Sequence, residues 1–399
     1  MTSFQISAPG RIILCGEHTV MYGKQVVAAS LNLRTMLNFY ELPLEPGIVR
    51  IDFPDVGINR LDIPLQMITN FISNENYYLV LDDDIIFLRH VQYFITLNGL
   101  WSTYEQRFSL QTFFFLLLVI AKNEELVIKS FHVRLTTQLT ISAGLGSSTS
   151  FATCLAACFL HWSCLQKGDH SEFTSEELIR ISTYVMSSEE VIQNYVFNQD
   201  HMVCTHGRVT TFQFREPLNT QSEIINTPEM YIMLVDAKIC LNKSQRMKQL
   251  AYMKCRYGNA ADVLLDKIDV ISQEIVTILR IIRDQGTNMD LQLLEGLYEN
   301  LQTNLSLNQD FLLNLDLSHP NFDTICLIAK TCGFKGKLTG DGSSKVIILL
   351  PPNYHASEEH RSKVNNLTRC LAEKGFSGEI ITISCTGVRL DTDWRNFMD

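Results

Sequence analysis

The sequence lacks the basic patches that a nucleic-acid-binding protein needs. Of its 399 residues, 33 are Lys or Arg against 43 Asp or Glu, and no stretch combines basic with aromatic residues. Proteins that grip nucleic acids gather Lys and Arg on one face or along one helix. A nucleic-acid role is therefore disfavoured. The net charge of −10 does not argue against nucleotides, which bind locally at loops and metal ions.

The sequence also lacks any pair of cysteines with CxxC spacing. Its eleven cysteines are an odd number without a regular framework, and no secretory signal opens the chain. This pattern predicts reduced thiols in a cytosolic-type compartment. Cys154 and Cys158 share a helix face without completing a metal set, so we expect them to be buried as small apolar side chains.

No apolar run is long enough to suggest a membrane span. The most apolar stretch, FFFLLLVIA at 113–121, is followed at once by KNEE. A span needs ~20 apolar residues, so this stretch predicts a buried helix and no association with a membrane.

The composition is that of a globular protein, with 46% hydrophobic and 19% charged residues in a chain long enough for two domains. Predicted strands and helices mix without strict alternation, which indicates an α+β fold. The polar segment 217–229 predicts a boundary between an N-terminal domain (1–225) and a C-terminal domain (226–399).

The predicted elements follow from periodicity and capping signals. Thr174 and Glu177 have the spacing of a capping box at a helix start. We expect strands at 131–139, 207–214, 231–237, 346–350 and 379–384, and helices at 150–165, from 174, within 245–303, at 320–332 and at 357–374.

The segment ISAGLGSSTSF (141–151) lies between the predicted strand 131–139 and the predicted helix 150–165. Glycines let backbone N–H groups approach a phosphate, and a helix N-terminus favours negative charge. The order of strand, Gly/Ser loop and helix therefore predicts an anion site. The alternative is a glycine-rich turn that only closes a strand–helix unit.

Two further segments carry polar groups suited to phosphoryl transfer. They are APGRIILCGEHTVMYGK (8–24) and KLTGDG (337–342), and the chain has no Walker A pattern. With the loop at 141–151, these segments resemble the three motifs of the galactokinase–homoserine kinase–mevalonate kinase–phosphomevalonate kinase (GHMP) superfamily. The first motif, continued as QVVAASLNLRT to residue 35, and the second are matched nearly throughout.

Within this superfamily, the chain resembles the mevalonate kinases. Galactokinases also carry PGR and GEH, but they place an Asp two positions after the His, where this chain has Val20. SLNLRT (30–35) favours mevalonate kinases as well. The resemblance implies a two-domain fold, with an N-terminal domain like ribosomal protein S5 and a C-terminal domain of ferredoxin-like character.

The resemblance also implies roles for residues near the glycine loop. Backbone N–H groups of the loop would hold the phosphates of ATP, and Ser148 would give its hydroxyl to Mg²⁺. Glu17 and His18 would contact mevalonate, and the third motif would bring up Thr339 and Gly340 on the substrate side. The loop residues concerned are Gly144, Leu145, Gly146 and Ser147.

Two acids complete the implied site. The family places a metal-binding Glu eleven residues before its catalytic Asp, which selects Glu189 rather than Glu190 and pairs it with Asp200. Asp200 would accept or orient the proton of the attacking hydroxyl. Arg11, a fixed positive charge, would stabilise Asp200 and the transferring phosphoryl group.

The chain departs from the family in two places. Between Glu189 and Asp200 only the two end acids match. The third motif has lost most of its glycines, and its loop instead carries Asp341, Ser343, Ser344 and Lys345. Phosphorylation of mevalonate by ATP and Mg²⁺ is the function implied. Phosphomevalonate kinase, galactokinase and a catalytically weak nucleotide-binding protein of the same fold remain alternatives.

The resemblance further implies a homodimer and feedback inhibition by isoprenoid diphosphates. The cysteine usage predicts a cytoplasmic location, and a peroxisomal one stays open, although the chain has no SKL-type tail. His201 and His206 lie near Asp200 in the sequence. The other histidines, including His161 and His170, are single and unsupported, so we expect surface or helix-cap roles for them.

Overall fold

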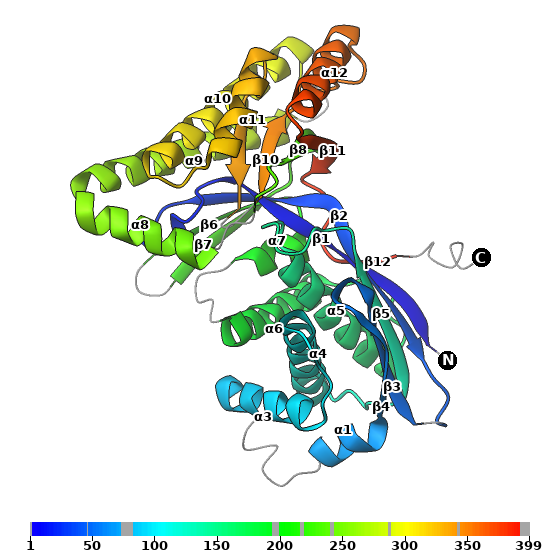
Figure 1. Cartoon of the computed structure of the whole chain (residues 1–399). Helices are drawn as coiled ribbons and strands as arrows, with labels where there is room; N and C mark the ends of the chain where they lie inside the picture. Colours follow the sequence, from blue (N-terminus) through cyan, green and yellow to red (C-terminus); the bar gives the residue numbers. More distant parts are fainter. Residues whose placement is uncertain are drawn as a thin grey trace.

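The computed structural model describes residues 2–45, 47–72, 83–193, 199–215, 219–239, 243–285, 289–340 and 344–391. Its central feature is a pair of long antiparallel strands, β1 (Ser3–Cys15) and β2 (Val26–Glu41). Both strands run between two groups of helices, as Figure 1 shows. Successive parts of β2 pair with strands from both halves of the chain, so β2 joins these halves in one sheet.

The N-terminal half places its helices on one face of the strands beside β2 (Figure 1). The strands are β3 (Ile48–Phe53), β4 (Ile58–Pro64) and β5 (Phe131–Thr137), with the short helices η1 (Val20–Tyr22) and η2 (Pro54–Val56). The α-helices are α1 (Leu65–Ile72), α3 (Asp84–Leu97), α4 (Tyr104–Asn123), α5 (Ser147–Lys167), α6 (Ser175–Gln193) and α7 (Asp200–His206).

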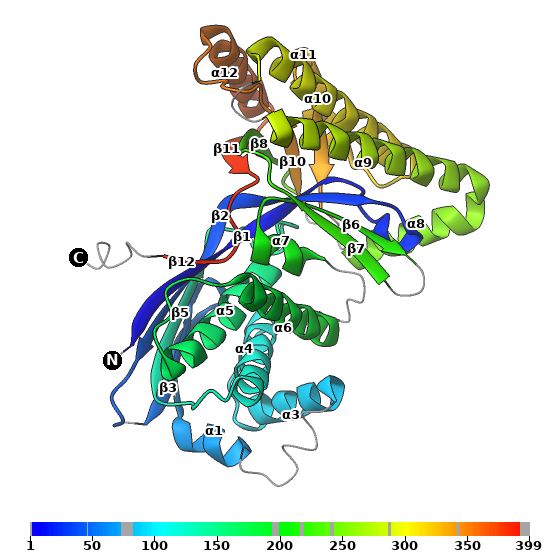
Figure 2. The same cartoon turned by 180° about the vertical axis from the view of Figure 1, so that it is seen from behind.

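The C-terminal half continues the sheet and covers it with a second group of helices (Figure 2). Its strands are β6 (Val209–Arg215), β7 (Asn219–Ile225), β8 (Met230–Asp236), β9 (Gly336–Thr339), β10 (Lys345–Leu349), β11 (Ser377–Ile383) and β12 (Arg389–Leu390). Its helices are α8 (Lys243–Tyr257), α9 (Asn259–Gln285), α10 (Leu291–Asn314), α11 (Pro320–Thr331) and α12 (Glu358–Glu373).

The strand order along the main path is β4-β3-β5-β2-β11-β8-β10-β9, with β1, β6, β7 and β12 attached beside it. Strand β12, almost at the end of the described chain, pairs with β1 and so returns to the N-terminal half. Two large hydrophobic clusters lie beneath the two helical groups. The predicted α+β class is confirmed, while the boundary at residue 225 stays a prediction.

Local signals in the sequence explain several elements. Thr174 and Glu177 form the predicted capping box, since the Thr174 N–H donates to Glu177 Oε2 at 2.8 Å and the Glu177 N–H donates to Thr174 Oγ1 at 3.2 Å. The apolar run 113–121 lies in α4, as predicted, and residues 113–118 are all buried. The polar segment expected to be a linker contains β7, which pairs with β6 as a hairpin.

Helix α5 is the one described helix that is long and apolar enough to span a membrane by length and composition. Within the protein, 83% of its 18-residue apolar window is buried. Cys154 and Cys158 are among its fully buried side chains, as expected from the sequence. Burial on this scale is typical of the core helix of a globular fold.

Candidate active site around Arg11

The guanidinium group of Arg11 is paired with the carboxylate of Asp200. Nε donates to Oδ1 and Nη2 donates to Oδ2, both at 2.6 Å, and the two side chains are 5% and 8% exposed. Arg11 lies in β1, and Asp200 is the first residue of α7, where the helix dipole favours a negative charge. Two parallel hydrogen bonds fix both the position and the plane of the carboxylate.

The loop between β5 and α5 packs against Arg11. The Arg11 N–H donates to the carbonyl oxygen of Leu145, and Nη1 donates to that of Gly144, each at 2.8 Å. Gly146, the residue before α5, has φ +74°, and a Cβ there would lie 2.9 Å from Cγ of Arg11. A side chain at 146 would therefore be strained and would displace Arg11.

The third motif approaches the same arginine from the C-terminal half. Gly340 has φ +81°, and a Cβ there would lie 2.6 Å from the Gly144 carbonyl oxygen and 3.3 Å from Nη1 of Arg11. Glycine is required at this close approach. Asp341 lies outside the described residues, and Lys345 Nζ lies 3.3 Å from Asp236 Oδ2.

The predicted order of strand, glycine loop and helix is confirmed by β5, the loop and α5. The loop backbone at Gly144 and Gly146 is left-handed, and α5 begins at Ser147. The first N–H groups of a helix have no carbonyl partner within the helix and can bind an anion. Ser147 and Ser148 are half-buried at this end of α5.

Glu189 in α6 faces the first turn of α5. It is 3% exposed, and its Oε1 accepts a hydrogen bond from the hydroxyl of Thr149. Its neighbour Glu190 is exposed, so the carboxylate selected by spacing is the one that points inward. Residues 194–198, within the segment that departs from the family pattern, lie outside the described residues.

Glu17, which follows β1, is enclosed by protein. Its Oε1 is paired with Nζ of Lys337, its Oε2 accepts from Asn308 Nδ2 at 3.0 Å, and the Glu17 and Lys337 side chains are 0% exposed. Lys337 also donates to the carbonyl oxygens of Leu338 at 2.6 Å and Ile13 at 3.3 Å. Burial raises the pKa of the nearby Cys15 thiol to about 12. The ion pair of Glu17 and Lys337 therefore connects the first motif to the third through a contact that solvent does not reach.

The remaining substrate-side candidates are also largely buried. The Thr339 hydroxyl donates to the Ile13 carbonyl oxygen and accepts from the Ile13 N–H, both at 2.9 Å. His18 has φ +62° and is 8% exposed, and His201 of α7 is 4% exposed. The contacts of Thr339 and His18 with the substrate stay predictions.

Some residues that shape this region carried no role in the sequence-based prediction. Lys337, Asn308 and Thr149 satisfy the two buried glutamates. Arg34 of β2 donates to the carbonyl oxygens of Thr386 at 2.9 Å and Gly387 at 2.7 Å, which anchors the returning C-terminal segment. Lys337 lies in the segment KLTGDG, and Arg34 lies in SLNLRT. Their place inside these family-like motifs was the sign in the sequence that they have a role.

One expectation about the histidines is wrong. His161 and His170, predicted to be single and unsupported, are in contact, with their Nδ1 atoms 2.5 Å apart. His161 is fixed in α5, and His170 lies in the loop before α6, which folds back over the end of α5. Sequence separation alone could not reveal this pairing.

The chain is similar in sequence to mevalonate kinases of other organisms, and no family model matches it. It is 28% identical over 397 residues to the mevalonate kinase of Homo sapiens, covering 96% of this chain and 94% of the relative. It is 25% identical over 405 residues to that of Dictyostelium discoideum, covering 97% and 96%.

The fold is similar to solved structures of the same group. The L. major mevalonate kinase in complex with R-mevalonate has a TM-score of 0.61 at 16% identity, covering 97% of each chain. A Lactococcus lactis galactokinase and a Streptococcus pneumoniae phosphomevalonate kinase each have a TM-score of 0.59. The GHMP kinase fold is therefore shared by kinases that are named for different substrates.

Proposed function

We propose that this chain, which has the fold of the GHMP kinases and is similar to mevalonate kinases over nearly its whole length, is an ATP-dependent mevalonate kinase. The reaction is the transfer of the γ-phosphoryl group of ATP to the primary hydroxyl of mevalonate, giving ADP and 5-phosphomevalonate. The observation that carries this proposal is the buried, two-point pair of Arg11 and Asp200 at the foot of the glycine loop.

The chemistry follows from the position of this pair. The mevalonate hydroxyl oxygen attacks the γ-phosphorus as the bond to the β–γ bridging oxygen breaks, and the hydroxyl proton passes to the Asp200 carboxylate. Arg11 holds that carboxylate in one plane and places a fixed positive charge beside the charge that develops on the phosphoryl oxygens. No covalent enzyme intermediate is required.

The phosphate side of the site is the loop and the start of α5. The backbone N–H groups of Gly144, Leu145, Gly146 and Ser147 would bind the phosphate oxygens of ATP. The Ser148 hydroxyl and the buried Glu189 carboxylate are hard oxygen donors near this helix end, which fits Mg²⁺. When bound, Mg²⁺ would neutralise phosphate charge.

The substrate side would be formed by Glu17, His18, Thr339 and Gly340. Because the Glu17 side chain is 0% exposed and enclosed by Lys337 and Asn308, it would act by holding Lys337 and the third motif in place. His18 adjoins it in a strained left-handed conformation.

The test is a coupled ADP-release assay with mevalonate, phosphomevalonate and galactose as separate acceptors. We expect turnover with ATP, Mg²⁺ and mevalonate, and background rates with the other two. Turnover of phosphomevalonate or galactose instead would assign a related kinase. ATP binding without turnover of any acceptor would indicate a nucleotide-binding protein, the alternative favoured by the altered segment between Glu189 and Asp200.

Three further proposals concern the protein's context. The similarity favours a homodimer and feedback inhibition by isoprenoid diphosphates, and the unpatterned cysteines favour a cytoplasmic location, with a peroxisomal one as the alternative. Light scattering of the purified chain, inhibition assays with farnesyl diphosphate and cell fractionation would test them in turn.

A further inference from the structure

A second cluster of chemically active side chains lies at the opposite end of α5 from the glycine loop. Cys164 is in the last turn of α5, His170 is in the following loop, and Glu177 is in the first turn of α6. Cys164 follows Ser148 by 16 positions, which is about 24 Å along a helix. The proposed transfer reaction makes no use of this cluster.

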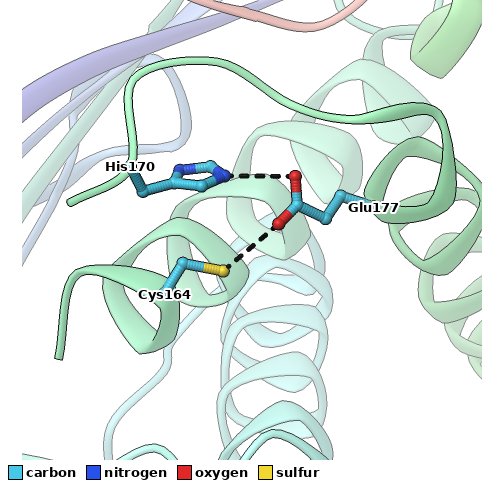
Figure 3. A group of neighbouring side chains, drawn as sticks. All are labelled: Cys164, His170 and Glu177. Carbon is cyan, nitrogen blue, oxygen red and sulfur yellow. Dashed lines mark hydrogen bonds and ion pairs between the residues drawn. The ribbon is translucent and has the colours of Figure 1, made fainter. Parts of the chain in front are cut away.

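The three side chains point toward one another, as Figure 3 shows. His170 Nε2 lies 3.1 Å from Glu177 Oε2, Cys164 Sγ lies 3.5 Å from Glu177 Oε1, and one ligand atom from each residue can be chosen so that all lie within 4.8 Å of one another. Zinc bonds of about 2.0–2.3 Å in a tetrahedron separate neighbouring ligand atoms by roughly 3.3–3.7 Å. The separations of 3.1 and 3.5 Å, each to a different oxygen of Glu177, are close to this spacing.

The surroundings hold two of the three side chains in place. His170 Nδ1 lies 2.5 Å from Nδ1 of His161, a 3% exposed residue. In this structure Nε2 of His170 donates to Glu177 Oε2, and a metal ion would replace that N–H while Nδ1 donates to His161; metal-binding histidines commonly have such an outer partner. Glu177 Oε2 accepts from the Thr174 N–H and hydroxyl, which fixes the carboxylate.

The guanidinium group of Arg180 lies near the cluster. Arg180 Nη2 is 3.8 Å from Glu177 Oε1. Arg180 is paired more closely with Glu124, through Nη1 at 2.6 Å. A metal ion would replace the hydrogen bonds that Glu177 accepts from His170 Nε2 and Cys164 Sγ. The carboxylate then keeps a lone pair for the ion on Oε1, because Thr174 binds Oε2 and an ionised carboxylate offers about four acceptor sites.

His170 of the cluster lines a cavity of about 400 Å³, together with His161, Leu165 and Asp391, among other residues. Cys164 and His170 are half-buried. An ion could enter by this route, and a water molecule from the cavity could provide a fourth ligand. Among the residues that the structure describes, this is the one group of three or more Cys, His, Asp or Glu side chains close enough to hold a metal ion.

We propose that Cys164, His170 and Glu177 bind one Zn²⁺ ion that links the end of α5 to the start of α6. A thiolate, an imidazole and a carboxylate are the donors that zinc prefers, whereas Mg²⁺ and Ca²⁺ favour oxygen ligands alone. Binding replaces the thiol proton of Cys164, which is released to solvent. The ion is separate from the Mg²⁺ that accompanies ATP.

The first test uses the full chain stripped of metal with a chelator and titrated with Co²⁺ in the presence of excess Mg²⁺. We expect one Co²⁺ per chain, the thiolate-to-cobalt charge-transfer absorption that a cysteine ligand produces, and displacement of that absorption by one equivalent of Zn²⁺. Bound Co²⁺ without the thiolate absorption, or no binding, would overturn the proposal. This result does not depend on whether any variant folds.

The second test measures zinc affinity by competition with a chromophoric chelator. Cys164→Ser and His170→Gln should each weaken binding by more than about a hundredfold, and His161→Phe by about 10–100-fold, the usual effect of losing an outer partner. Cys255→Ser, which alters an exposed thiol of α8, is the matched control and should bind as the unaltered chain does. Equal affinity in Cys164→Ser and Cys255→Ser would contradict the assignment.

Discussion

The two buried ion pairs that connect the first motif to distant parts of the chain differ in how fully protein surrounds them. Arg11 and Asp200 keep exposed fractions of 5% and 8% beneath the glycine loop, whereas Glu17 and Lys337 are both 0% exposed. Asp200 is held by a two-point contact from one side chain, while Glu17 and Lys337 are closed off by Asn308 and backbone carbonyls. The first pair can take part in chemistry, and the second holds the two halves of the protein together.

The largest effect should come from removing the charge of Asp200. Asp200→Asn keeps the size and hydrogen-bonding capacity of the side chain but cannot accept the hydroxyl proton, so we expect kcat to fall by about 10²–10⁴-fold. ATP affinity should change little, while the thermal midpoint should fall, because Arg11 keeps a buried charge without its partner. Asp266→Asn, at an exposed pair with Lys24, is the control for losing one acid. Asp200→Asn activity within threefold of the control would remove Asp200 from the reaction.

Breaking the fully buried pair of Glu17 and Lys337 should lower the stability of the protein. Lys337→Met leaves the Glu17 carboxylate buried without its cation, so the free energy of unfolding should fall by about 3–5 kcal/mol. The double variant Glu17→Gln/Lys337→Met should be less destabilised than the sum of its single variants. Lys24→Met, at the exposed pair, should cost under about 1 kcal/mol. Urea unfolding measures all of these, and additive losses would show that the two residues do not act as a pair.

The contact between the third motif and the glycine loop should have an intermediate effect. Gly340→Ala incurs a left-handed backbone cost of about 1–2 kcal/mol and a further cost of about 1–3 kcal/mol for overlap with the Gly144 carbonyl oxygen. Gly333→Ala is a matched control, with φ +84° and no atom within 4 Å. Denaturation curves should show a larger loss of stability for Gly340→Ala than for Gly333→Ala. Equal losses would mean that the close approach is unimportant.

The smallest effect should come from a conservative change at the reacting pair. Arg11→Lys keeps the positive charge but loses one of two hydrogen bonds to Asp200, and kcat should fall by about tenfold, as expected for about 1.5 kcal/mol. Steady-state kinetics with mevalonate varied at saturating ATP provide the measurement. A loss as large as that of Asp200→Asn would indicate that the two-point geometry, not the charge, is essential.

Local signals predicted the parts of the fold that depend on neighbouring residues. The capping box at Thr174 and Glu177, the buried helix at 113–121 and the strand–loop–helix order around Gly146 were all predictable from spacing and periodicity. The strand β7 was missed because its residues are polar, and its existence depends on pairing with β6.

Contacts over long sequence separations could not be predicted in the same way. The pair of Arg11 and Asp200 was expected only because the motifs resembled a family, and the partner of Glu17 lies 320 positions away. The grouping of Cys164, His170 and Glu177 depends on the loop that folds back over α5, and no spacing rule for metal ligands signals it.

Transfer of phosphate to mevalonate at the Arg11–Asp200 pair is most directly tested by a single-turnover experiment with γ-labelled ATP. The enzyme, in excess over ATP, is mixed with mevalonate and Mg²⁺ and quenched over time. We predict that the label appears in 5-phosphomevalonate as ATP disappears, and that Asp200→Asn binds ATP but transfers the label at least about a hundredfold more slowly. Label released as inorganic phosphate, or equal transfer rates in the two proteins, would contradict this account.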